Sequence, residues 1–248
     1  MWWVLFAVVA MAITVITMFL SKKDTRSEFA LSMYFQNGLF FPLIVINGLF
    51  GAGSIYIVHL FIFCIFHPVV FFGTSHLFFR KKADDGKKHK MRLERLINPV
   101  LVATVLAVGI RLAGLEVYIP DFIIQMLNIL GGMTLPLIMI ILGGSLYIDF
   151  LKKGKIYVVE VLKFVFIKNI IFPLVFIGLM VLIRPDYNVA LIMMLESAVP
   201  PITAIPVVAE REGGNVSISN QFILASFVFS IVSIPLMFTL FSTFFPMP

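Results

Sequence analysis

Residues 186–215 read DYNVALIMMLESAVPPITAIPVVAEREGGN, an apolar run that is long enough to cross a bilayer. Glu196 and Ser197 lie inside this run, and Pro200 and Pro201 follow at its middle. A proline pair removes two backbone donors and clashes with the preceding turn, so the run predicts a helix interrupted at Pro200 and Pro201. In hydrocarbon the freed carbonyl groups need partners, so such an interruption persists only where it is buried or lines a cavity.

An interrupted span with an acid beside the interruption is typical of a transporter site. The alternative is a proline-kinked helix whose acid only contacts neighbouring helices.

The composition predicts an all-α polytopic membrane protein. Hydrophobic residues make up 60% of the chain and charged residues 13%, whereas a soluble domain carries about 25% charge. The basic residues lie in short loops between apolar runs, so the net charge of +6 indicates the positive-inside pattern and no nucleic-acid partner. The sequence has no nucleotide-binding motif and no nucleophile–base pair, which disfavours an ATP-driven pump and an enzyme. No cofactor is expected.

Eight runs have about the length that a transmembrane helix needs. They cover about residues 2–20, 29–54, 55–79, 96–113, 122–148, 156–183, 186–215 and 217–245. The second run is also predicted to be interrupted, at Pro42, with Gln36 and Asn37 just before the proline. The small residues Gly131, Gly132, Gly143 and Gly144 in the fifth run favour close helix packing.

The distribution of basic residues predicts the orientation of the chain. Loops on one side hold 15 Lys or Arg residues, eight of them between Arg80 and Arg95, and the other side has only Arg111 and Arg184. This asymmetry places residues 81–95 in the cytoplasm and both termini outside a plasma membrane.

The order of plain and interrupted spans suggests an inverted repeat. Residues 1–80 hold a plain span, an interrupted span and a third span, and residues 149–248 repeat this order from the opposite side. Residues 81–95 form the basic loop, and residues 96–148 add two further spans. Inverted repeats of this kind build several secondary transporter folds.

Three stretches resemble the auxin efflux carrier family and indicate a prokaryotic member. They are INPVLVATVLAVGIRLAGLEVYIPDFIIQMLNILGGMTLPLIMIILGGSL at residues 97–146, ESAVPPITAIPVVAEREGG at 196–214 and FQNGLFFPL at 35–43. The resemblance implies ten helices in two inverted repeats, similar to sodium/proton antiporters, and a small organic anion as substrate. It implies a site where the two interrupted helices cross, at Gln36, Asn37, Pro42, Ser197, Pro200 and Pro201.

The first two helices of the family pattern have no counterpart in this sequence. In the family, these helices belong to the scaffold, which also makes the dimer contact. We therefore expect either a homodimer through the fourth and fifth spans or pairing with a separate subunit that supplies the missing helices. The alternative function is that of a truncated or degenerate carrier that acts as a non-transporting membrane scaffold.

Two charged residues are candidates for ion coupling. A charged Glu196 near the bilayer midplane costs roughly 3 kcal/mol or more unless it is paired, so it could bind a proton or a sodium ion in exchange with substrate. Lys168, deep in the sixth run, could neutralise an anion or pair with an acid, or it could snorkel or contact carbonyl groups. The alternative for Glu196 is a structural acid that stays protonated or pairs with Lys168. Cys64 is interpreted as core packing, and His59, His67 and His76 show no metal-ligand spacing.

Overall fold

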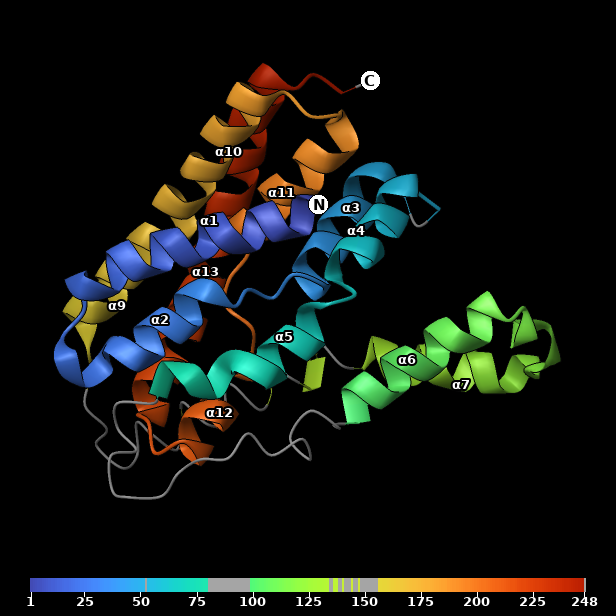
Figure 1. The fold of residues 1–248 in the computed structure, drawn as a ribbon, viewed down its shortest axis with the longest axis horizontal. Helices are drawn as coiled ribbons and strands as arrows, with labels where there is room; N and C mark the ends of the chain where they lie inside the picture. The colour runs from blue at the N-terminus through green and yellow to red at the C-terminus, as the bar shows by residue number, and fades with distance from the viewer. Residues whose placement is uncertain are drawn as a thin grey trace.

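A computed structural model describes residues 1–51, 53–79, 99–133 and 156–247, together with residues 136, 137, 140, 144 and 147. These residues form helices and contain no strand (Figure 1). The predicted cytoplasmic loop at residues 81–95 lies outside the described residues, as does most of the fifth predicted span beyond residue 133.

Four helical segments are long and apolar enough to cross a membrane: Trp2–Leu20, Ile55–Phe79, Val158–Ile183 and Val216–Phe244. Their bounds agree with the predicted spans to within two residues. The first segment consists of α1 (Trp2–Thr17) and η1 (Met18–Leu20), and the second of α4 (Ile55–Cys64), α5 (His67–Thr74) and η3 (Ser75–Phe79). The third consists of α9 (Val158–Phe166), η6 (Ile167–Ile171) and α10 (Phe172–Ile183), and the fourth is the single helix α13 (Val216–Phe244).

Two further segments are interrupted helices. The first consists of η2 (Lys23–Thr25), α2 (Arg26–Tyr34) and α3 (Phe40–Phe50), and the second of α11 (Tyr187–Ala198) and α12 (Ile205–Arg211). Each interruption lies between two long segments in the chain order. The second interruption coincides with Pro200 and Pro201, as the sequence predicts.

Two of the long segments are themselves irregular, and a proline explains each case. The predicted third span bends after Cys64, because Pro68 lies in the first turn of a new helix, α5. In the segment Val158–Ile183, Pro173 has no amide for the Asn169 carbonyl, and its ring clashes with that carbonyl. The helix responds with one π turn, η6, which widens it at Lys168 and Asn169.

A shared apolar core holds the long and the interrupted helices together. Helix α11 packs between α10, α13 and α4, while α2 packs against α1 and α13. Aromatic rings fill the contacts: the Phe6 ring stacks on Phe176 at 4.5 Å between centroids, and Phe164 stacks on Phe222 at 4.4 Å. Helices α2 and α11 of the interrupted segments are thereby largely enclosed by long ones.

Helices α6 (Pro99–Leu112) and α7 (Asp121–Gly132), joined by η5 (Leu115–Tyr118), lie apart from this core beyond α5 (Figure 1). The Asn98-Pro99 helix-start signal is not tested, because residue 98 lies outside the described residues. The described residues of α7 are all exposed or half-buried, in contrast to those of the core helices.

Candidate functional site

The two interrupted helices meet at their interruptions. Gln36 and Pro201 form an isolated antiparallel bridge. The Asn37 amide donates to the Pro200 carbonyl at 2.8 Å, and the Ile202 amide donates to the Phe35 carbonyl at 3.1 Å. Each interruption therefore satisfies backbone groups that the other leaves free, which is how two broken helices can persist inside a membrane protein. We call residues 35–39 and 199–204 the crossing.

The first interruption precedes Pro42, which corrects the predicted position. The α-helix ends at Tyr34 and resumes at Phe40, so that Pro42 is the third residue of α3. A helix tolerates proline in its first turn because those amides have no acceptor within the helix. Pro42 is buried but belongs to the resumed helix, whereas Gln36 and Asn37 are buried within the crossing itself.

Helix α11 brings Glu196 and Ser197 to the crossing and is enclosed on every side. All nine residues from 190 to 198 are buried. The Ser197 hydroxyl donates to the Met194 carbonyl at 2.7 Å and so serves its own helix.

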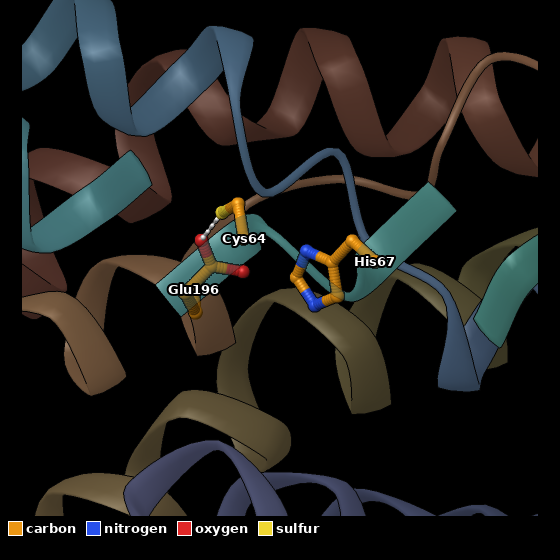
Figure 2. Close-up of side chains that lie close together, drawn as sticks. All are labelled: Cys64, His67 and Glu196. Carbon is orange, nitrogen blue, oxygen red and sulfur yellow. Dashed lines mark hydrogen bonds between the residues drawn. The ribbon is translucent and has the colours of Figure 1, made fainter. Parts of the chain in front are cut away.

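The Glu196 carboxyl lies against the bend of the segment Ile55–Phe79. The Cys64 thiol donates to Glu196 Oε1 at 3.2 Å and also contacts the Gly38 carbonyl at 3.2 Å (Figure 2). A side chain at Gly38 would collide with the carboxyl, since a Cβ atom there would lie 2.7 Å from Oε1. Glu196 Oε2 has no hydrogen-bond partner among the described residues.

Lys168 lies on the π turn and is fully buried. Its ammonium donates to the Met33 carbonyl at 3.2 Å and lies 4.1 Å from the centre of the Phe172 ring. Met33 is in the last turn of α2, so Lys168 satisfies a carbonyl that the end of this helix leaves free. No ion pair within 4 Å joins Lys168 to Glu196 in the described part of the chain.

Asn169, the next residue of the π turn, connects the segment Val158–Ile183 to α13. Its amide donates to the Ser226 carbonyl at 3.2 Å and to the Ser233 hydroxyl at 3.3 Å, and the Ser226 hydroxyl donates back to Asn169 Oδ1 at 2.7 Å. This buried polar network fixes the rotation of the helix that carries Lys168.

A small pocket lies beside the crossing. Its walls are mostly apolar and aromatic, and its polar side-chain groups come from Trp3, Tyr34, Gln36 and His67. Gln36 Oε1 and Trp3 Nε1 are buried and make no hydrogen bond to any described residue, so an acceptor and a donor are available to a ligand. The lining residues are Trp3, Phe6, Ala7, Ala10, Tyr34, Phe35, Gln36, His67, Val70, Phe71 and Ile202.

The structure thus gathers Gln36, Asn37, Pro200, Pro201 and Glu196 at one place and puts Lys168 behind them. Sequence reasoning missed Gly38, Cys64, His67 and Asn169. The Asn37-Gly38 pair is a turn signal that could have located the first interruption. The approach of Cys64 to Glu196 joins residues 132 positions apart and left no local signal.

A comparison with known protein families identifies the family of this chain. The family model described as "Membrane transport protein" matches residues 1–238, which is nearly the whole chain. No curated protein and no solved structure matches it. The resemblance inferred from the sequence is confirmed at the level of the family, and the chain belongs to the membrane transport protein family.

Proposed function

We propose that this membrane transport protein is a secondary carrier of a small organic anion, which binds at the crossing and passes the membrane by alternating access. The observation that carries the proposal is the pair of reciprocal backbone hydrogen bonds between residues 35–37 and 200–202. Irregular backbone at membrane depth occurs in transporters where it lines a substrate site.

The charge around the crossing favours an anion. Helix α3 begins at Phe40, directly after the first interruption, so its free first-turn amides and the positive end of its dipole lie near the crossing. Lys168 adds a buried positive charge on the other side. The small pocket beside Gln36 adds Trp3 Nε1 as a further donor.

The order of the elements supports two inverted repeats and eight spans. In each half, a long segment is followed by an interrupted helix and by a second long segment: Trp2–Leu20, α2 with α3 and Ile55–Phe79 in one half, Val158–Ile183, α11 with α12 and α13 in the other. Helices α6 and α7 supply the remaining two spans. With the predicted basic cytoplasmic loops, both termini lie outside the cell.

Glu196 is the proposed coupling residue. Its carboxyl is buried beside the crossing, and Oε2 can accept a proton or contribute to a sodium site together with the Gln36 amide, which also interacts with this carboxyl. A buried acid at membrane depth is costly in its charged form, so binding of a cation there stabilises the carrier in the loaded state.

Uptake of labelled mono- and dicarboxylates into proteoliposomes tests the proposal. We expect saturable uptake of at least one acid, and a clear increase in the KM for it in Lys168→Met. The matched control is Lys163→Met on the same helix segment, because the Lys163 side chain is 42% exposed and pairs with Glu160 away from the crossing. Failure of every acid to move under proton and sodium gradients would favour the non-transporting scaffold instead.

We also propose that α6 and α7 form the contact with a second copy of the chain or with a separate subunit. Added Cβ atoms at Gly131, Gly132 and Gly144 meet no described atom within 4 Å, so these small residues face away from the described part of the chain. Small residues let membrane helices approach closely. Mass photometry of the detergent-purified protein should show a dimer that Gly132→Leu shifts toward the monomer. A monomer at all concentrations would contradict self-association.

A further inference from the structure

Three potential metal ligands of different chemistry converge beside the crossing. Cys64 Sγ, a ring nitrogen of His67 and a carboxylate oxygen of Glu196 all lie within 4.8 Å of one another (Figure 2). Cys64 and His67 come from the two sides of the bend between α4 and α5, and Glu196 comes from α11. The proposed transport function uses Glu196 alone and leaves the thiol and the imidazole without a role.

We propose that Cys64, His67 and Glu196 form a binding site for a transition-metal ion such as Zn²⁺, and that the bound ion fastens the bend of the segment Ile55–Phe79 to α11. Zinc accepts sulfur, nitrogen and oxygen ligands in a tetrahedral arrangement. Such an arrangement separates its ligand atoms by roughly 3.3–3.8 Å. The distance of 3.2 Å between Cys64 Sγ and Glu196 Oε1 is already close to this value.

His67 can complete the set with a small movement. Its ring contacts Trp3 and Phe63 only through edge-to-face packing and lines the pocket, so it is not locked by hydrogen bonds that the structure describes. Glu196 Oε2, which has no hydrogen-bond partner among the described residues, is turned toward the imidazole (Figure 2). The pocket beside the crossing reaches this cluster at His67, which is one of its lining residues.

The binding step exchanges a proton for the metal. The Cys64 S–H bond breaks, the proton leaves to solvent, and the sulfur electron pair bonds the ion. The hydrogen bond to Glu196 Oε1 is lost in this step, and the carboxylate is held by the ion instead. Without a metal, the same thiol and carboxyl remain a hydrogen-bonded packing contact, which is the alternative that the experiment must exclude.

Cobalt titration distinguishes the two alternatives, because a thiolate bound to Co²⁺ gives a charge-transfer absorption band. Cys64 is the only cysteine of the chain, so the band reports this residue alone. In detergent-purified protein with any affinity tag removed, we expect one Co²⁺ per chain with the band, and its displacement by Zn²⁺. Cys64→Ser should abolish the band, and His67→Gln should weaken binding at least roughly tenfold.

His59→Gln serves as the matched control, since this histidine lies on α4 but outside the cluster and binds its own helix at the Ile55 carbonyl. It should bind cobalt as the wild type does. Because the ion joins two elements, Zn²⁺ should also raise the thermal midpoint of the wild type and of His59→Gln but not that of Cys64→Ser. Absence of the band in the wild type, or a band unaffected by His67→Gln, would overturn the proposal. Neither the cobalt band nor the thermal midpoint depends on transport, so both measurements test the metal site separately from the carrier function.

Discussion

The two interruptions at the crossing are built differently. The interruption after α11 has a proline pair at its centre, and all nine preceding residues are buried. The interruption after α2 has no proline within it, and in the following helix, α3, only Pro42 and Ile46 are buried. The second interruption is therefore specified by its own sequence and held by its surroundings, while the first depends on the hydrogen bonds that it receives from the second.

This difference indicates which side moves. Helix α3 exposes Ile44 and Leu49 and packs against α4 and α11, so it is less enclosed than α11. Helix α11 cannot shift without disturbing α10, α13 and α4 at once. In a transport cycle we expect α3 to move and α11 to stay fixed.

The largest effect is expected from replacing both Pro200 and Pro201 with alanine. The change restores two amides and allows α11 to continue beyond Ala198, so the Asn37 amide loses its acceptor. Proteoliposome uptake should fall to the level of protein-free liposomes. Pro235→Ala is the control, because α13 remains helical through Pro235, far from the crossing in sequence. Preserved uptake in the double variant would show that the proline pair does not set the crossing.

The two interruptions also differ in charge, because α11 brings an acid to the crossing, and Glu196→Gln tests this difference. The variant keeps the shape of the side chain and removes its ability to exchange a proton. Uptake should lose its dependence on a proton or sodium gradient, while binding of the substrate persists. Measurement of uptake with and without each gradient decides the matter, and an unchanged gradient dependence would exclude Glu196 as the coupling residue.

Gly38→Ala tests how closely the two interruptions must approach. The added methyl group collides with the Glu196 carboxyl, and overpacking of this kind lowers the free energy of unfolding by about 1–3 kcal/mol. Thermal unfolding in detergent should show the loss, and Glu196→Ala in the same chain should relieve it. Gly48→Ala is the control, because a Cβ atom there meets nothing within 4 Å. Equal destabilisation by the two glycine variants would contradict the steric explanation.

The smallest effect is expected from Pro42→Ala. Since the interruption ends before Phe40, the alanine variant keeps α3 and loses only the packing of the ring, with a cost below about 1 kcal/mol. Uptake should stay near the wild-type rate when measured beside the Pro200 and Pro201 double variant. A loss as large as in that variant would mean that Pro42 sets the first interruption after all.

Sequence reasoning located the long segments well because each is a continuous apolar run with clear ends. It also located the second interruption, where the proline pair is a local signal. It misplaced the first interruption, because residues 35–39 leave the helix in order to pair with residues 200–202, and such pairing is a tertiary event. The prediction placed the interruption at Pro42, although this proline lies in the first turn of the following helix.

The composition of the site was predictable only in part. Glu196 and Lys168 stand out in the sequence because charges in apolar runs are rare. The neighbours that decide their chemistry, Cys64 and Met33, are ordinary apolar-run residues, and only folding brings them near. The bend that presents Cys64 and His67 could have been read from Pro68, which is a helix-start signal.

The hydrogen bond from Lys168 to the Met33 carbonyl has a mechanical consequence. This hydrogen bond connects the end of α2, in the first half of the chain, to the π turn in the second half. Pulling these two elements apart would leave an ammonium group in the interior of the bilayer without its acceptor, which costs several kcal/mol. We therefore expect α2 and the segment Val158–Ile183 to stay together as a single rigid body, so that any hinge lies on the α3 side of residues 35–39.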